Sequence, residues 1–265
     1  LLQTERFAEA LDERKAEYAK EPVRKSTLFR SEDRLAILKE LGDEFRRHRS
    51  DELAPPENFV PPAGRVDAVL APHIDYIRGG PGYVWAHRAL AHASDAETFV
   101  VLGTLHKPSS HPFIATRKSF ETPLGTVEVD TATLDEFEKG FEGELYEDEL
   151  MHADEHTIEI QVVYLQHMME NRPFKIVPIL VGSFEPFLHF SPKIAPSEDD
   201  EIASFIQTLR KISEKSEGKV ALIGSVDFAH MGPEFGDEDL NSEDVEDVVR
   251  EKDQEMLSAV EAVDP

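Results

Sequence analysis

The stretch Thr98-Phe-Val-Val-Leu-Gly-Thr-Leu-His106 decides the fold class of this chain. Its apolar run, Phe99–Leu102, is short and lies between Thr98 and Gly103, which is typical of a buried strand. Similar apolar runs occur elsewhere along the chain, at 66–70, 176–181 and 220–223. Helical patterns separate the runs, at 82–93, 133–141, 155–169 and 200–213. Strands that alternate with helices predict a single α/β domain with a largely parallel central sheet flanked by helices.

The N-terminal part of the chain has a different pattern. It reads as two charged, amphipathic helices divided near Pro22, with apolar residues at helical spacing in the second from Leu35 to Phe45. The proline-rich stretch Leu53–Gly64 is typical of a linker. We therefore predict an N-terminal helical extension over residues 1–52 and the α/β domain over residues 53–265. Within that domain, Phe120–Asp130 contains turn residues and is expected to form a hairpin.

The charge balance excludes several classes of partner. The chain of 265 residues carries 54 acidic residues against 28 Lys and Arg, a formal net charge of −26. Because this charge repels polyanions and anionic lipid surfaces, we expect no nucleic-acid partner and no membrane association.

There is no cysteine, which excludes disulfides and thiolate metal ligands within these residues. The apolar runs are too short to span a bilayer and the N-terminus shows no signal peptide, so we expect a cytoplasmic protein.

Histidines follow three of the predicted strands. His73 follows the first, His106 follows the second, and Asp227 with His230 follows the last. Because the carboxyl ends of parallel strands lie along one edge of a sheet, where ligand crevices form, we expect these side chains at one rim. One histidine at a strand end is more often structural, so the prediction depends on the repetition. Imidazole and carboxylate ligands suit iron, copper, zinc or nickel, and two histidines with one carboxylate are typical of non-haem Fe(II) sites.

A further candidate lies at the start of a predicted helix, in Asp154-Glu-His156-Thr-Ile-Glu159. If Asp154 caps this helix, His156 and Glu159 lie on one face of it. His156 is then a candidate general acid or base, and Glu159 is a candidate for orienting a metal-binding histidine. The alternative interpretation is a capping and ion-pairing cluster at a helix start.

Five motifs, in this order, resemble those of the Memo family, which includes the microbial AmmeMemoRadiSam system protein B. They are Ala-Pro-His73-Ile-Asp-Tyr, Leu-Gly-Thr-Leu-His106, Asp-Glu-His156-Thr-Ile-Glu-Ile-Gln, Val-Pro-Ile-Leu-Val-Gly182 and Ser-Val-Asp227-Phe-Ala-His230. The resemblance covers about residues 68–232 and implies a fold similar to class III extradiol dioxygenases, which use non-haem Fe(II). It also implies a crevice that binds iron or copper, and association with AMMECR1-like and radical SAM proteins.

The resemblance implies that His73 and His106 are metal ligands and that Asp227, His230 and His156 surround them as catalytic candidates. Asp75 stands where the family usually has glycine, so it is a further candidate ligand. The resemblance also implies another ligand, often a cysteine, in a C-terminal segment beyond the last residue of this chain.

Three functions fit these residues, and the first two belong to different classes. In the first, a metal-dependent redox or dioxygenase-like protein, His73, His106 and a carboxylate bind the metal, and His156 or His230 transfers protons. In the second, a non-catalytic module binds a peptide or small-molecule ligand in the same crevice. A metal-assisted hydrolase is a third, because histidine and aspartate also hold zinc-bound water.

Overall fold

The structure, a computed structural model, describes residues 2–28, 63–169, 172–188, 195–230, 233 and 243–262. It divides into two compact units, Leu1–Ser225 and Val226–Pro265. The first unit contains the two sheets described below, and the second contains helix α8 (Glu243–Glu261). The helix predicted from Leu35 to Phe45 and the predicted boundary at residue 52 lie outside the described residues.

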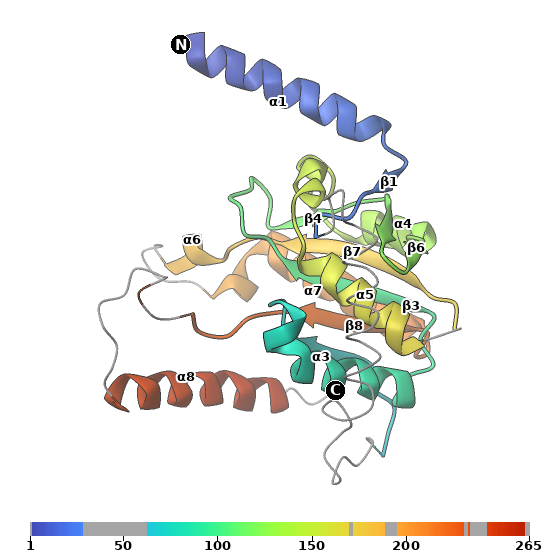
Figure 1. Ribbon diagram of the computed structural model, residues 1–265, viewed down its shortest axis with the longest axis vertical. Helices are drawn as coiled ribbons and strands as arrows, with labels where there is room; N and C mark the ends of the chain where they lie inside the picture. Colours follow the sequence, from blue (N-terminus) through green and yellow to red (C-terminus); the bar gives the residue numbers. More distant parts are fainter. Residues whose placement is uncertain are drawn as a thin grey trace. The chain divides into compact units, whose positions relative to one another are not determined.

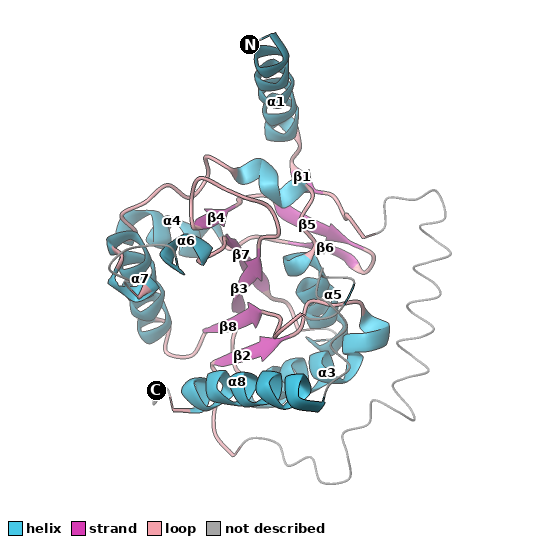
Figure 2. Ribbon diagram, turned by 90° about the vertical axis from the view of Figure 1, so that its left-hand side faces the viewer, coloured by secondary structure: helices cyan, strands magenta, loops and turns pink. Residues whose placement is uncertain are grey.

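Five strands form the main sheet of the first unit, in the order β2-β8-β3-β7-β4 (Figures 1 and 2). They are β2 (Ala68–Ala71), β8 (Val220–Ser225), β3 (Thr98–Thr104), β7 (Lys175–Val181) and β4 (Phe113–Ala115). The first four pair in parallel, which confirms the four predicted strands, and β4 pairs antiparallel with β7. The apolar pattern does not reveal β4, because its three residues give too short a run.

Helices cover both faces of the main sheet, as Figure 2 shows. On one face lie α3 (Tyr76–Ala93) and α5 (Thr157–Met169), and on the other lie α4 (Thr131–Gly140) and α7 (Asp200–Lys215). Most of α5 is buried, including polar residues, which is typical of a helix enclosed between two layers. The predicted fold class, a largely parallel sheet flanked by helices, is confirmed. None of the described helices is both long enough and apolar enough to cross a membrane.

A smaller sheet connects the N-terminal segment to the rest of the first unit. Its strands, in order, are β1 (Val23–Arg24), β5 (Ser119–Thr122) and β6 (Gly125–Val127). β5 and β6 form the predicted antiparallel hairpin, and β1 pairs in parallel with β5. Helix α1 (Leu2–Lys20) precedes β1, so the predicted N-terminal helix is confirmed, and the segment after it also contributes a strand. The remaining short helices are η1 (Glu149–Ala153), α6 (Glu185–Leu188) and η2 (Pro196–Glu198).

Strand β3 and the start of α5 touch at Gly103. A Cβ atom at Gly103 would lie 2.5 Å from Ile158 Cγ1 and 2.6 Å from Thr157 Oγ1, so α5 would have to move away. Gly103→Ala is expected to lower the free energy of unfolding by about 1–3 kcal/mol, measured by urea denaturation. Gly64→Ala is the control, because a Cβ at Gly64 meets nothing within 4 Å. Equal losses in the two variants would contradict this packing.

Two histidines of the core are fully enclosed. His87 on α3 has its Nδ1 2.9 Å from the carbonyl oxygen of Tyr83, and His152 on η1 has its Nε2 2.9 Å from that of Ile114. Burial penalises the charged ring, and it outweighs the carbonyl contacts to lower the pKa of His87 to about 4 and that of His152 to about 3. Both rings are therefore neutral in the folded protein at neutral pH.

The buried histidines make stability fall as the solution is acidified. Between pH 6.5, the ordinary pKa, and about 4, the unfolded chain binds a proton at each ring that the folded chain does not bind. The free energy of unfolding is therefore expected to fall by roughly 1.4 kcal/mol per pH unit for each histidine. Urea denaturation at several pH values measures the slope, which should be smaller in His152→Gln than in the wild type. An unchanged slope in His152→Gln would show that His152 is not the group that titrates.

Candidate metal centre

Three histidine rings meet at the carboxyl edge of the main sheet. His73 follows the end of β2, His106 follows the end of β3, and His156 directly precedes α5. Ring centroids are 5.1 Å apart for His73 and His106, 5.4 Å for His106 and His156, and 6.3 Å for His73 and His156. The parallel strands thus bring His73 and His106 to one rim, as expected from their positions after the strands, and the turn before α5 adds His156.

Polar contacts lock the elements that carry these histidines. Gln161 on α5 donates from Nε2 to the carbonyl oxygen of Pro72 at 2.7 Å and to Ser225 Oγ at 2.8 Å. The Ser225 hydroxyl in turn donates to the carbonyl oxygen of Thr157 at 2.8 Å, and the Thr157 hydroxyl donates to that of Thr104 at 2.9 Å. The ends of β2, β3 and β8 are thereby joined to the first two turns of α5.

His73 is held in one tautomer. Its ring is buried, 4% exposed, and its Nδ1 lies 3.1 Å from the carbonyl oxygen of Ser225. A carbonyl oxygen only accepts hydrogen bonds, so Nδ1 of the neutral ring carries the proton. The lone pair that can bind a metal is therefore on Nε2.

One carboxylate holds the other two histidines. Glu155 Oε2 lies 3.1 Å from Nδ1 of His106, and Glu155 Oε1 lies 3.0 Å from Nδ1 of His156. The backbone N–H groups of His106 and His156 also donate to this carboxylate, at 2.9 and 2.8 Å. Glu155 is 6% exposed, whereas the side chains of His106 and His156 are 48% and 37% exposed. At His106, a carboxylate on Nδ1 fixes the tautomer with Nε2 available for a metal, which is the common arrangement behind metal-binding histidines.

The electrostatics keep Glu155 ionised. Burial raises the pKa of its carboxyl, but hydrogen bonds from the His156 ring and from the backbone N–H groups of His106 and His156 outweigh this and lower the pKa to about 2. The same hydrogen bond to Glu155 raises the pKa of His156, against the opposite effect of burial. Glu155 therefore accepts hydrogen bonds from both rings over the whole neutral range.

The structure corrects two expectations about the start of α5. Asp154 does not start the helix; it ends η1, and its carboxylate accepts hydrogen bonds from Arg14 at 2.6 Å and Lys107 at 3.1 Å. Nor does Glu159 orient a histidine, because its carboxylate pairs with Arg24 in the interior. The predicted helix begins at Glu155, whereas α5 begins at Thr157. Glu155 therefore takes the orienting role predicted for Glu159.

The other predicted site residues lie in different places. Asp75 is exposed, directly before α3, and its carbonyl oxygen accepts a hydrogen bond from the backbone N–H of Gly79 at 2.9 Å. Asp227 and His230 belong to the second unit, in which His230 Nε2 lies 3.1 Å from Asp227 Oδ2. Their roles as a metal ligand or as catalytic groups stay predictions.

The donor groups of the first unit suit a transition metal. One ligand atom from each of His106, Glu155 and His156 lies within 4.8 Å of the other two, and His73 adds another imidazole beside His106. Imidazole-rich sites favour iron, copper, zinc or nickel over magnesium and calcium, which prefer oxygen ligands. The residues present therefore fit the metal that the sequence resemblance implies.

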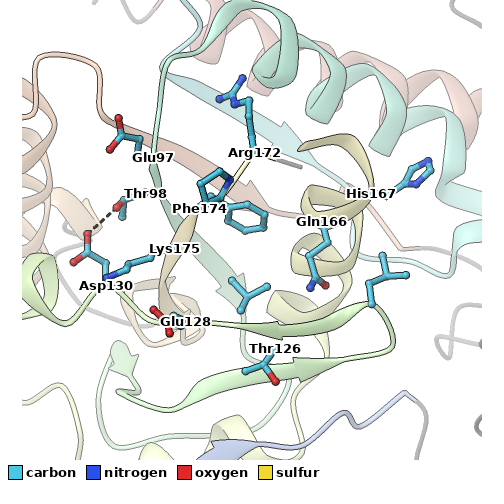
Figure 3. Close-up of a pocket in the computed structure, with 13 residues that line it drawn as sticks. Glu97, Thr98, Thr126, Glu128, Asp130, Gln166, His167, Arg172, Phe174 and Lys175 are labelled. Atoms are coloured by element: carbon cyan, nitrogen blue, oxygen red, sulfur yellow. Dashed lines mark hydrogen bonds between the residues drawn. The ribbon is translucent and has the colours of Figure 1, made fainter. Parts of the chain in front are cut away.

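A separate pocket lies at the opposite edge of the main sheet (Figure 3). Thr98 and Lys175, which begin β3 and β7, line it together with Asp130, Gln166 and Arg172. Both acidic and basic side chains line this pocket, and some of the lining side chains form hydrogen bonds with one another. For example, Thr98 donates to Asp130 Oδ2 at 2.7 Å (Figure 3). Because it lies at the amino ends of the strands, this pocket is not the crevice of His73 and His106.

Comparisons with known proteins agree with the motifs of the site. A family model described as "Memo-like protein" matches residues 55–265. A MEMO1 family protein of Methanosarcina acetivorans is 31% identical over 200 residues, which are 75% of this chain and 62% of that protein. One of Archaeoglobus fulgidus is 33% identical over 170 residues, which are 64% of this chain and 57% of that protein. One of Aquifex aeolicus is 28% identical over 169 residues, which are 64% of this chain and 41% of that protein.

The chain thus spans about half the length of the curated relatives it matches. The family model nevertheless covers most of the chain, and it includes His73, His106, Glu155 and His156. The chain belongs to the Memo family.

Proposed function

We propose that His73 and His106 bind a redox-active transition metal, iron or copper, at the carboxyl edge of the main sheet. The observation that carries this proposal is the contact of Nδ1 with a hydrogen-bond acceptor in both rings, the Ser225 carbonyl for His73 and the Glu155 carboxylate for His106. Each ring then has Nε2 as its metal-binding nitrogen. For the carboxylate that completes the ligand set, the two candidates remain those of the sequence analysis, Asp75 and Asp227.

His156 is proposed to transfer protons beside the metal. Its Nδ1 is held by Glu155 and its ring stacks on that of His106 with the planes 13° apart. Glu155 stabilises the protonated ring, so His156 can hold a proton beside the metal. A bound iron or copper ion would supply one-electron chemistry that these side chains lack.

The activity that fits such a centre is redox or dioxygenase-like, and its substrate is a small molecule that reaches the half-exposed rings of His106 and His156. Support for this activity comes from the donor set and from the motif resemblance. Association with AMMECR1-like and radical SAM proteins is part of the same proposal and rests on the resemblance alone.

Anaerobic titration of metal-free protein with Fe(II), and separately with copper, tests the proposal by calorimetry. We expect one ion per chain in the wild type and a loss of affinity of at least about 100-fold in His106→Ala, since a ligand contributes more than the 10- to 100-fold of a supporting residue. His111→Ala is the matched control. His111 lies between β3 and β4, as His106 does, but it pairs with Glu147 at 3.0 Å. If the wild type takes up neither metal, the redox proposal fails and the peptide- or ligand-binding module becomes the better account.

A further inference from the structure

The residues that matter most in the candidate centre lie in an irregular turn. Helix η1 ends at Ala153 and α5 begins at Thr157, so Glu155 and His156 belong to neither helix. The backbone N–H groups of Asp154 and Glu155 both point to the carbonyl oxygen of Met151, at 3.3 Å, which is long for such a bond. Apart from the Glu155 carboxylate, which accepts from the backbone N–H of His156 at 2.8 Å, the turn has few strong contacts of its own, so contacts from elsewhere in the chain contribute to its shape.

Arg24 supplies those contacts. Its side chain is completely buried, and its Nε donates to the carbonyl oxygen of His152 at 2.9 Å. One terminal nitrogen donates to the carbonyl oxygen of Glu155, and the other pairs with the carboxylate of Glu159. The three acceptors lie before, within and after the turn. A planar guanidinium offers its donors in a fixed fork, so one side chain sets the position of all three.

The N-terminal segment is built to hold Arg24 in place. β1 pairs with β5, and the guanidinium carbon lies 5.0 Å from the centre of the Phe120 ring. The backbone N–H and the hydroxyl of Thr27 donate to Glu159 Oε2 at 2.9 and 3.0 Å, and the Ser26 hydroxyl donates to Oε1. The buried charges are thus paired and hydrogen-bonded, as a stable buried ion pair requires.

This segment lies outside the region that the family model matches, which begins at residue 55. We propose that Arg24 is a positioning residue for the candidate metal centre, through its hold on the turn that carries Glu155 and His156. The N-terminal segment is then part of the site, since it keeps the carboxylate where it binds both His106 and His156. The consequence for metal affinity rests on the proposed function, whereas the effect on the histidine rings does not.

Arg24→Lys tests the proposal, because lysine keeps the positive charge but lacks the planar guanidinium that donates to several acceptors at once. In metal-free protein labelled with ¹⁵N at histidine, the ring nitrogen shifts of His106 and His156 report their tautomers. We expect these signals to change from one tautomer to a mixture in Arg24→Lys, while those of His111 stay unchanged. Metal affinity is expected to fall about 10-fold, the lower end of the range for residues that support metal ligands.

Phe205→Leu is the control for a general loss of stability. Phe205 stacks on Phe113 with centroids 3.7 Å apart, on the α7 side of the sheet. This variant should lower the free energy of unfolding without changing the histidine signals. If Arg24→Lys does not fold, Thr27→Ala gives a milder test, because it removes the hydroxyl that accepts a hydrogen bond from Arg24 and donates one to Glu159.

Wild-type histidine signals in the folded Arg24→Lys protein, or in Thr27→Ala where that variant replaces it, would overturn the proposal, and so would equal changes in Phe205→Leu. If the wild type binds no metal, the proposed function fails, and the ring signals of Arg24→Lys still decide whether Arg24 positions the turn.

Discussion

Replacing Glu159 by alanine is expected to lower the free energy of unfolding by about 3–5 kcal/mol, because it leaves the Arg24 guanidinium buried without its counter-charge. Both side chains of the pair are 0% exposed, so water does not replace the lost carboxylate. The donors of Ser26 and Thr27 lose their acceptor in the same variant. Urea denaturation at neutral pH measures the loss.

Two further variants separate this explanation from a general effect of removing an acid. Glu136 pairs with Lys215 at 2.8 Å on the surface, with side chains 44% and 72% exposed, so Glu136→Ala should change stability by no more than about 1 kcal/mol. The double variant Arg24→Met with Glu159→Leu removes both charges and should recover part of the loss. A loss in Glu159→Ala as small as that in Glu136→Ala would show that the pair is not buried in solution.

Replacing Glu155 by glutamine is expected to weaken metal binding by about 10- to 100-fold. Glutamine has nearly the same shape, but its amide nitrogen donates hydrogen bonds. That nitrogen would face one of the two Nδ1–H groups from which Glu155 accepts a hydrogen bond. One ring then turns or changes tautomer, and its Nε2 no longer presents a lone pair to the metal. Titration of the metal-free variant with Fe(II) or copper measures the change.

Asp154→Asn is the matched control for Glu155→Gln. Asp154 is the neighbouring carboxylate, and it pairs with Arg14 and Lys107 at the surface rather than with a histidine. The control should keep wild-type metal affinity. Equal weakening in the two variants would mean that the net negative charge of the turn, and not the contact with the histidines, supports the metal.

The sheet could be predicted from the sequence because its three central strands, β8, β3 and β7, are largely buried on both faces. Each of β3 and β7 therefore reads as a continuous apolar run, and the helices between the strands follow from the alternation. The convergence of His73 and His106 follows from the same topology, since parallel strands end at one edge.

The details around α5 could not be predicted in the same way. The role of Glu155 depends on where the helix begins. The sequence predicts a start at Glu155, two residues before the observed start at Thr157, and it therefore assigns the histidine contact to Glu159 instead of Glu155. The partner of Glu159 is Arg24, which is 135 residues away in the sequence. A pattern within one helix carries no information about such a contact, because only tertiary structure brings the two residues together.

The metal content of the purified protein tests the central claim most directly. Elemental analysis of the wild type, His73→Ala and His106→Ala would be made on samples prepared side by side. We predict close to one iron or copper ion per wild-type chain and little metal in either variant. Wild-type metal content in both variants, or none in wild-type protein reconstituted anaerobically with Fe(II) or copper, would contradict a metal centre at these histidines.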